Sequence, residues 1–258
     1  MGQNIVERKV YDIYERDLEK EVAGGPVPKH LAIIMDGNRR YAEEFLDSDI
    51  SEGHQAGKQK LLEVAEWCIQ MGIGYITVYA FSTENFARRD EEVDYLMDLA
   101  AESFRSMSDL DMVQDNHVRI QAMGSLDALP EKVRDAIAYA EERTGMFTDH
   151  VMSVCIAYGG RRELVDAARA IGWKIKRGEM EPDDITEDTI SQNLYSSGIP
   201  DPDLVLRTSG EVRISNFLLW QLAYSELYFT DVYWPGFRRI DFLRAIRTYQ
   251  QRVRRYGS

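Results

Sequence analysis

Residues 30–41 read HLAIIMDGNRRY, and this stretch decides the fold class. The apolar run Leu31–Met35 predicts a buried strand, and the polar residues from Asp36 to Tyr41 predict the first turn of a helix. In open α/β sheets, ligands bind outside the carboxyl ends of the strands, which is where this turn lies. The stretch therefore predicts an α/β fold together with the position of a binding site.

Four other apolar runs, several of them rich in Val and Ile, predict further buried strands. They are Tyr75–Phe81, Val118–Met123, Val151–Tyr158 and Asp203–Arg207. The longer segments between them are typical of helices and cover Gly53–Met71, Asp90–Val113, Pro130–Arg143 and Arg161–Lys176. This alternation predicts an α/β fold with a mostly parallel central sheet flanked by helices.

The length and composition favour one domain. The chain has 258 residues, of which 44% are hydrophobic, and no change of composition divides it. Apolar residues recur at helical spacing from Val6 to Val22, beside charges of both signs, which predicts an amphipathic helix. We expect residues 1–25 to form this helix, packed on a single domain that covers residues 26–258.

The charge and the cysteines restrict the partners and the compartment. The net charge of −13 repels nucleic-acid phosphates, so we expect no nucleic-acid binding. Cys68 and Cys155 lack the spacing of a disulfide or a metal site, which predicts reduced thiols and a cytoplasmic protein. No apolar run reaches the roughly 20 residues that a bilayer span requires. We therefore expect at most peripheral contact with a membrane.

The first polar cluster, Asp36–Tyr41, has the residue types of a phosphate site. Gly37 lets the backbone approach a ligand, and the start of a helix offers free N–H groups. Arg39 and Arg40 add charged donors, and Asp36 is placed to hold a metal bridged to phosphate oxygens. An Asx-type helix cap with exposed arginines explains the same residues by structure alone.

A second polar cluster, Phe81–Phe86, begins at the end of the predicted strand Tyr75–Phe81, and Arg88 comes soon after it. It combines hydroxyl, carboxylate, amide and guanidinium groups. A plain loop rich in turn-forming residues is the alternative. Two such clusters at successive strand ends favour a shared crevice.

A third polar cluster follows the predicted strand Asp203–Arg207. In it Arg207 and Arg213 bracket a glycine-containing turn, with Ser215 close by. Planar guanidinium groups match pairs of phosphate oxygens, which favours a diphosphate clamp. Surface ion pairing is the alternative, although arginines outnumber the acids on this loop.

The three clusters, in this order, resemble the cis-prenyltransferase family, whose members condense isopentenyl diphosphate with an allylic diphosphate. The resemblance covers about Lys29 to Gly257. Its motifs are His30–Tyr41, Gly53-His54, Tyr79–Arg88, Ala157–Arg161, Arg207–Gly210, Arg213–Glu226 and Tyr228–Pro235. It implies a magnesium-dependent transferase that works as a homodimer, in which charge stabilisation dominates catalysis.

The resemblance also implies roles for individual residues. Asp36 would be the catalytic carboxylate that binds Mg²⁺, Glu226 would complete the metal environment, and Asn85 matches the proposed proton acceptor. The implied substrate-binding residues are Gly37, Asn38, Arg39, Arg40, Tyr41, His54, Ser82, Thr83, Glu84, Phe86, Arg88, Arg207, Arg213, Ile214 and Ser215. The terminal Arg255-Tyr256-Gly257 resembles the tail that reaches the neighbouring subunit, and a frayed C-terminus is the alternative.

Two positions depart from the family pattern. Ile50 stands where many members have a phosphate-binding arginine, and Val212 stands where bacterial members have histidine. A charge-assisted hydrogen bond contributes about 1.5–3 kcal/mol, so its loss changes affinity tenfold or more. We therefore hypothesise short products or a relaxed choice of acceptor.

Two rival functions remain. Asp183–Glu187 approximates the Asp-Asp-x-x-Asp motif of trans-prenyltransferases, but it follows Pro182 and is typical of a solvated helix start. The other rival is a noncatalytic subunit of a heteromeric prenyltransferase. Asp36 and the C-terminal Arg255–Gly257 argue against it.

Overall fold

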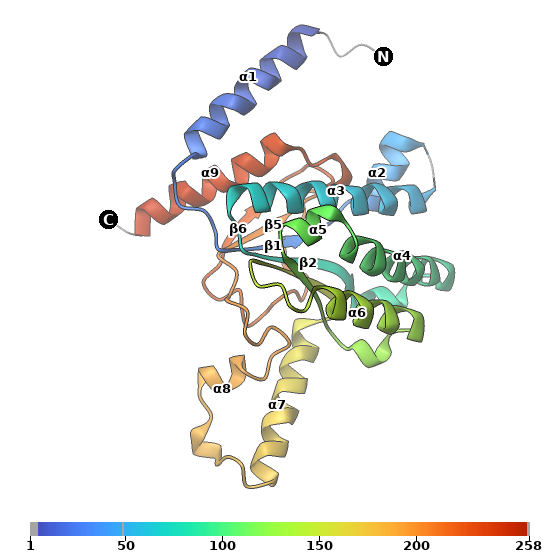
Figure 1. Ribbon diagram of the computed structural model, residues 1–258, viewed down its shortest axis with the longest axis vertical. Helices are drawn as coiled ribbons and strands as arrows, with labels where there is room; N and C mark the ends of the chain where they lie inside the picture. Colours follow the sequence, from blue (N-terminus) through green and yellow to red (C-terminus); the bar gives the residue numbers. More distant parts are fainter. Residues whose placement is uncertain (1–4, 48, 257–258) are drawn as a thin grey trace.

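A six-stranded, wholly parallel sheet forms the centre of the protein (Figure 1). The computed structural model describes residues 5–47 and 49–256, without the side chains of residues 5–10, 12 and 253–256. The strands are β1 (His30–Ile34), β2 (Tyr75–Ser82), β3 (Val118–Met123), β4 (His150–Tyr158), β5 (Leu204–Arg207) and β6 (Glu226–Phe229), in the order β3-β4-β2-β1-β5-β6. The predicted α/β class is confirmed, and β6 is a strand that the sequence did not predict.

The helices surround this sheet, mostly where the sequence predicts them. They are α1 (Ile5–Val22), α2 (Asn38–Tyr41), α3 (Ile50–Met71), α4 (Asp90–Ser108), α5 (Asp111–Asp115), α6 (Glu131–Thr144), α7 (Gly160–Lys176), α8 (Glu187–Ser191) and α9 (Arg239–Tyr256). The single helix predicted over Asp90–Val113 is wrong, because Leu110 is extended and the Gln114 side chain caps the Ser108 carbonyl at 2.6 Å. The sequence did not predict α9.

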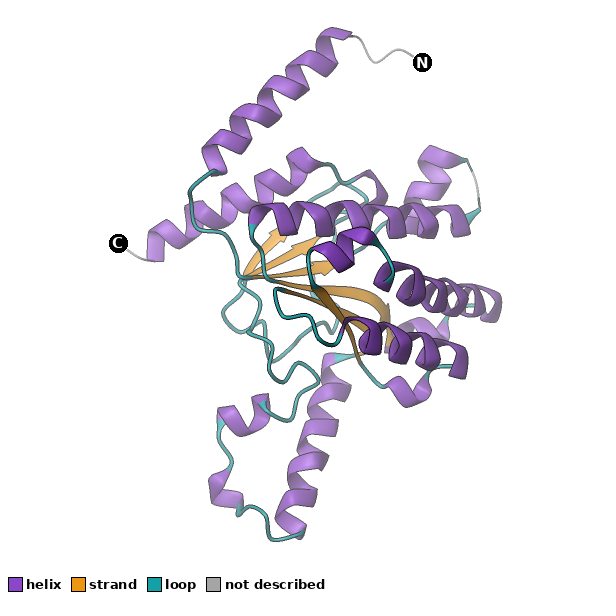
Figure 2. Cartoon of the chain, in the orientation of Figure 1, coloured by secondary structure: helices purple, strands orange, loops and turns teal. Residues whose placement is uncertain are grey.

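The two faces of the sheet are covered differently. Side chains alternate along β1, so that Leu31 and Ile33 pack with α3, α4, α6 and α9, whereas Ala32 and Ile34 face the opposite side. Loops and turns cover much of that second side, while α7 and α8 project away from it (Figure 2). Burying each large apolar side chain stabilises the fold by about 1.5–3 kcal/mol.

A buried carboxylate fixes these loops against the sheet. Glu163 of α7 is only 1% exposed and accepts hydrogen bonds from the Tyr158 hydroxyl at 2.5 Å and the Tyr195 backbone N–H at 2.9 Å. The Gln221 amide also donates to it, at 3.2 Å. Burial raises the pKa of Glu163. The loops that carry part of the polar edge are thereby tied to β4 and α7.

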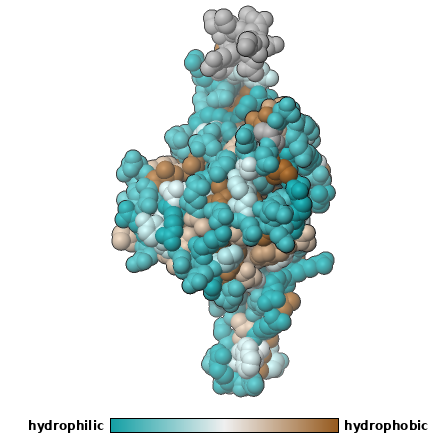
Figure 3. Space-filling view, turned by 90° about the vertical axis from the view of Figure 1, so that its right-hand side faces the viewer, coloured by the Kyte–Doolittle hydropathy of each residue, from teal (hydrophilic) through white to brown (hydrophobic). Residues whose placement is uncertain are grey.

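The N-terminal helix joins the core at its second half. Leu18 and Val22 are buried in the main core, and α1 packs beside α9. Ile13 is exposed. Across residues 5–47 and 49–256, no helix is both long and apolar enough to cross a bilayer. Hydrophilic residues predominate on the face in Figure 3, with hydrophobic ones scattered among them.

Candidate active site

Three neighbouring strands bring the three polar clusters to one edge of the sheet. In the central order β2-β1-β5, Ile34 of β1 is level with Tyr79 of β2 and with Arg207 of β5. All three strands run in the same direction, so the residues that follow them gather at the carboxyl edge. This register explains why the three polar clusters, which are far apart in the sequence, lie close together.

An ion pair joins the first and third clusters. Arg207 Nη2 donates to Asp36 Oδ2 at 2.7 Å, and Arg207 Nη1 donates to Ser215 Oγ at 2.8 Å and to the Arg213 carbonyl. Arg207 is 4% exposed, whereas the Asp36 side chain is 30% exposed. Among the described residues, the second carboxylate oxygen of Asp36 has only a long ionic contact, 3.8 Å from Arg40. One Asp36 oxygen therefore remains open to a ligand.

The backbone at Asp36 is held from the neighbouring strand. The Thr208 hydroxyl donates to the Asp36 carbonyl at 2.6 Å and accepts from the Asp36 N–H at 3.0 Å. Gly37 has φ of +105°, and a Cβ there would lie 2.8 Å from the Tyr233 ring. Only glycine fits this turn, which leads directly into α2 and its residues Arg39 and Arg40.

Arg40 of the first cluster and Arg213 of the third cluster are both paired with Glu211. Arg40 donates to Ser209 Oγ at 2.7 Å and lies 3.7 Å from Glu211. Arg213 is 61% exposed and pairs with Glu211 at 2.5 Å. Ser209 and Ser215 have positive φ angles, which cost of order 1–3 kcal/mol each and cluster at functional sites. The loop of residues 207–216 therefore has a strained backbone next to Arg207 and Arg213.

Glu92, an acid to which the sequence did not point, lies close to two arginines and a histidine. The Glu92 side chain on α4 is 7% exposed, and Arg88 donates to it at 2.8 Å. Arg39 lies 3.8 Å and His54 3.9 Å from the same carboxylate. Burial, followed by the charge of Arg88, lowers the pKa of His54 to about 4. The imidazole is therefore neutral near pH 7.

We expect Glu92→Gln to lower kcat/KM about tenfold, because it removes the counter-ion that orders Arg39 and Arg88 beside the neutral His54. Steady-state kinetics with both substrates measure this effect. The exposed neighbour Glu91 offers a matched control, since Glu91→Gln changes the same charge outside the cluster. Equal kinetics for the two variants would show that Glu92 does not organise the site.

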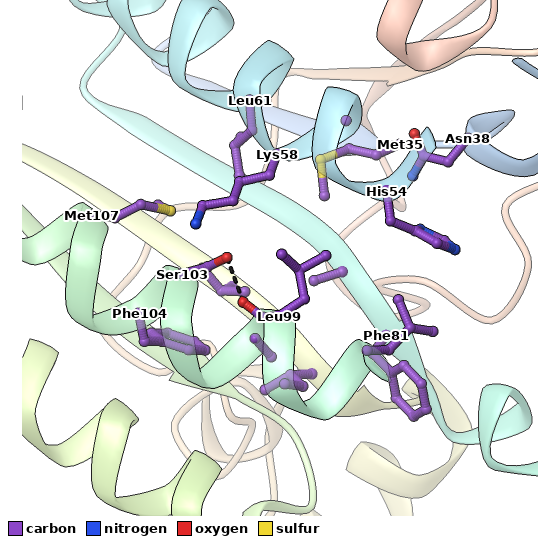
Figure 4. Close-up of a pocket in the computed structure, with 16 residues that line it drawn as sticks. Met35, Asn38, His54, Lys58, Leu61, Phe81, Leu99, Ser103, Phe104 and Met107 are labelled. Atoms are coloured by element: carbon purple, nitrogen blue, oxygen red, sulfur yellow. Dashed lines mark hydrogen bonds between the residues drawn. The ribbon is translucent and has the colours of Figure 1, made fainter. Parts of the chain in front are cut away.

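Three cavities meet at this edge. The Asp36 cavity, of about 350 Å³, is lined by Met35–Arg40, Glu43, His54 and Arg88. The Arg207 cavity, of about 600 Å³, extends from there to β2 and the 207–216 loop. The apolar cavity, of about 130 Å³, lies between α3 and α4 above the sheet (Figure 4). Met35, Asn38 and His54 line all three, so two polar spaces and one apolar space share a junction.

The junction carries polar atoms without partners. Asn38 Oδ1 and His54 Nε2 are buried and accept or donate no hydrogen bond among the residues that the structure describes. Buried polar groups are normally paired, so such orphans point to a missing ligand. Asn38 is held there by close packing on α3, since a Cβ on Gly57 would lie 2.5 Å from its Oδ1.

Most predicted site residues line the cavities. These are Asp36, Gly37, Asn38, Arg39, Arg40, His54, Ser82, Glu84, Asn85, Arg88, Arg207, Arg213 and Ser215. Tyr41, Thr83, Phe86 and Ile214 are absent from the cavity walls. Two of them pack elsewhere: Tyr41 stacks on Phe45, and Phe86 lies edge-on to Phe81. The Asn85 amide oxygen accepts from the Ser82 N–H at 2.9 Å.

Glu226 does not lie at this edge within the chain. It begins β6, level with Leu204, whereas Arg207 is level with Phe229. Its carboxylate accepts from Arg252 Nη1 at 2.7 Å instead. Within one chain Glu226 and Asp36 therefore lie at opposite ends of parallel strands, and the predicted role of Glu226 in the metal environment stays a prediction. Across residues 5–47 and 49–256, no group of three His, Cys, Asp or Glu side chains is placed to hold a metal.

The predicted C-terminal contact falls outside the described residues. The helix α9 includes Arg255 and Tyr256, but their side chains and Gly257 are not described. The same is true of the Val6 and Val10 side chains in the N-terminal stripe.

Known proteins match almost the whole chain. A family model described as putative undecaprenyl diphosphate synthase matches residues 34–257. A tritrans,polycis-undecaprenyl-diphosphate synthase (geranylgeranyl-diphosphate specific) of Methanocaldococcus jannaschii is 51% identical over 96% of this chain and 89% of its own. The protein of the same name from Pyrococcus horikoshii is 50% identical over 97% of this chain and 94% of its own.

Solved structures agree with these relatives. Lavandulyl diphosphate synthase from Lavandula x intermedia, in complex with dimethylallyl diphosphate, has a TM-score of 0.83 and 38% identity, covering 89% of this chain and 96% of its own. A probable undecaprenyl diphosphate synthase from Campylobacter jejuni has a TM-score of 0.73 and 32% identity, covering 90% and 100%.

These findings decide between the rival functions. The parallel sheet excludes the all-helical fold of trans-prenyltransferases. Relatives at about half identity are named as synthases, which does not support a noncatalytic subunit. The chain belongs to the cis-prenyltransferase family and is a prenyl-transferring enzyme.

Proposed function

We propose that this enzyme extends geranylgeranyl diphosphate with isopentenyl diphosphate to a long Z-prenyl diphosphate, as a magnesium-dependent homodimer. The observation that carries the proposal is the junction at which two basic, polar cavities open onto one apolar cavity. Residues 26–258 would form the catalytic domain, with residues 1–25 packed on it. The names of relatives at 50–51% identity favour this substrate and an undecaprenyl product.

The cavities separate the parts of the two substrates. The allylic diphosphate would lie in the Asp36 cavity, against Gly37–Arg40 at the start of α2, with its tail in the apolar cavity. Isopentenyl diphosphate would lie in the Arg207 cavity, held by Arg88, Arg207 and Arg213. Both diphosphates then flank Asp36, and both hydrocarbon parts face the junction.

The side chains would favour ionisation of the allylic substrate. As its C–O bond breaks, Arg39 and Arg40 stabilise the charge on the departing diphosphate, and the apolar cavity shields the allylic cation from water. The isopentenyl double bond attacks that cation, and a proton is then lost. Asn85 is the proposed acceptor; its oxygen keeps one lone pair beyond the bond from Ser82.

The donor set fits Mg²⁺ when substrate is present. Mg²⁺ is usually bound by one or two carboxylates together with substrate phosphates. Asp36 offers one oxygen without a close partner, at the wall shared by both polar cavities. When bound, the ion supplies charge stabilisation to the diphosphate oxygens.

A second copy of the chain would supply Glu226 and the C-terminal residues to the Asp36 site. Glu226 and Arg252 are bonded near the end of α9, and residues 255–257 follow directly. In a homodimer, this corner of one subunit would meet the Asp36 edge of the other. Glu226 and the C-terminal residues would then complete the neighbouring site.

Removal of metal is expected to abolish turnover. Excess EDTA should lower product formation to background, and Mg²⁺ should restore it, because charge on the leaving diphosphate is otherwise stabilised by arginines alone. Incorporation of labelled isopentenyl diphosphate measures the effect. Turnover that persists in EDTA would contradict the assignment of Asp36 as a metal ligand.

The substrate proposal is tested by one purified chain. Dimethylallyl, farnesyl and geranylgeranyl diphosphates are each supplied with isopentenyl diphosphate and Mg²⁺, and the products are sized by mass spectrometry. We expect geranylgeranyl diphosphate to give the highest kcat/KM and a long product. Short products from dimethylallyl diphosphate would instead support the relaxed choice of acceptor inferred from Ile50. The similar lavandulyl diphosphate synthase was solved with dimethylallyl diphosphate bound.

A further inference from the structure

Tyr233 lies in a loop whose backbone is fixed against the candidate active site. The carbonyl of Val232, which precedes it, accepts from the Ser209 N–H at 2.8 Å. The N–H of Trp234, which follows it, donates to the Asp36 carbonyl at 3.0 Å, and the Trp234 side chain is fully buried. Because both neighbours are anchored, the Tyr233 ring projects from a rigid backbone.

The Tyr233 ring contacts the whole stretch of chain around α2. It packs on Gly37, where a Cβ would lie 2.8 Å from it, and the Arg40 guanidinium lies over it, 5.3 Å from the ring centroid. Its hydroxyl donates to Glu44 at 2.8 Å, and Phe45 meets it edge-on at 6.2 Å between centroids. One side chain therefore contacts the turn before α2, the helix itself and the turn that follows it.

The contact with Arg40 holds the face of the guanidinium and leaves its edges free. A guanidinium stacks on an aromatic ring through its face and donates hydrogen bonds in its own plane. Arg40 Nη2 donates to Ser209 Oγ at 2.7 Å, whereas Glu211 and Asp36 lie at 3.7 and 3.8 Å, beyond hydrogen-bond range. Arg40 lines the Asp36 cavity, so several of its N–H groups remain for a diphosphate there.

A guanidinium that is already held in place binds a diphosphate better than a free one. The Arg40 side chain is 39% exposed, so without the ring it would sample many rotamers and lose that freedom on binding. A group held in its binding orientation avoids this loss and needs no rearrangement as charge develops on the leaving diphosphate. The ring therefore favours binding and ionisation of the allylic substrate.

We propose that Tyr233 is a positioning residue, whose ring holds Arg40 in the orientation that binds the allylic diphosphate. The inference rests on the proposed function, which puts that diphosphate in the Asp36 cavity. Tyr233 lines none of the three cavities, so it acts through Arg40 rather than by touching substrate. Arg40 does not line the Arg207 cavity, so the loss of the ring should spare isopentenyl diphosphate.

Two variants separate the ring from its hydroxyl. Tyr233→Leu removes the ring, whereas Tyr233→Phe keeps it and loses only the hydrogen bond to Glu44. Calorimetry measures the Kd of a thio analogue of geranylgeranyl diphosphate, which requires no turnover. We expect Tyr233→Leu to raise this Kd about fivefold, the upper worth of an exposed cation–π contact, and Tyr233→Phe to leave it within about twofold of wild type. The KM for isopentenyl diphosphate should stay unchanged in both.

A double-variant cycle tests whether the ring acts through Arg40. In an Arg40→Met background, Tyr233→Leu should cause no further rise in the Kd of the thio analogue, because the group that the ring positions is absent. A residue that only supports the fold would weaken binding in either background. The cycle therefore distinguishes positioning of Arg40 from simple packing on Gly37.

A second cation–π pair provides the matched control. Arg105 also lies 5.3 Å from the ring centroid of Tyr139, and neither residue lines the three cavities, so Tyr139→Leu should leave the Kd unchanged. An unchanged Kd in Tyr233→Leu, an equal rise in the Arg40→Met background, or an equal rise in Tyr233→Phe would overturn the positioning role. Wild-type enzyme that neither binds the analogue nor elongates geranylgeranyl diphosphate would overturn the proposed function as well.

Discussion

Asp36→Asn is expected to lower kcat about a thousandfold while the protein stays folded. The substitution keeps the size of the side chain but removes the charge that pairs with Arg207 and that would hold Mg²⁺. The loss should appear in kcat more than in KM, because the charge on the leaving diphosphate develops in the transition state. Single-turnover kinetics with geranylgeranyl diphosphate measure it.

An exposed aspartate provides the control for this variant. Asp98 pairs with Lys132 on the surface, and Asp98→Asn should leave kcat unchanged. Circular dichroism and thermal unfolding of both variants separate chemistry from folding. If Asp36→Asn kept the wild-type kcat, the Asp36 carboxylate would have no part in the mechanism.

Arg207→Met is expected to harm both stability and catalysis. Arg207 is 4% exposed and bonds to Asp36, to Ser215 and to the Arg213 carbonyl, so its loss breaks a nearly buried ion pair and its network. Because Asp36 stays 30% exposed, we expect a cost of about 1–3 kcal/mol in the free energy of unfolding, from the polar groups that lose their partner. We also expect kcat/KM for isopentenyl diphosphate to fall by roughly two to three orders of magnitude, because a diphosphate ligand is lost.

A substitution of Arg213 separates the effect on stability from the effect on catalysis. Arg213 is 61% exposed and pairs with Glu211, so Arg213→Met should change the free energy of unfolding by less than about 1 kcal/mol. Its kcat/KM for isopentenyl diphosphate should still fall tenfold or more, since one charge-assisted bond is lost. Urea unfolding and steady-state kinetics of both variants test the contrast. Equal loss of stability in the two variants would contradict it.

The sequence predicted those parts of the fold that depend on local pattern. The apolar runs that became β1 to β5 are short and mostly buried, and a polar cluster follows β1, β2 and β5. Because parallel strands share a carboxyl edge, these clusters could be expected to meet. Gly37 was singled out as a residue that lets the backbone approach a ligand, and the structure adds that this position has a positive φ.

What the sequence did not predict depends on tertiary packing. β6 has only four residues and is half-buried at every position, so its apolar run, Leu227–Phe229, is too short to mark a strand. The position of Glu226 relative to Asp36 depends on the strand order and register. Glu92 lies in an acidic first turn typical of a helix start, and only the packing of α4 against His54 shows that it is the buried member. Glu92 lies four residues before Leu96, which lines the apolar cavity, so both side chains lie on the same face of α4. This spacing was the available sign that Glu92 faces the site.

The most direct test of the proposed site is a crystal structure of the enzyme with Mg²⁺, isopentenyl diphosphate and a thio analogue of geranylgeranyl diphosphate that does not ionise. We expect one diphosphate at Gly37–Arg40, the other against Arg207 and Arg213, the metal on Asp36, and the hydrocarbon tail between α3 and α4. Both diphosphates bound away from the Asp36 edge, or a tail directed away from the apolar cavity, would contradict the account.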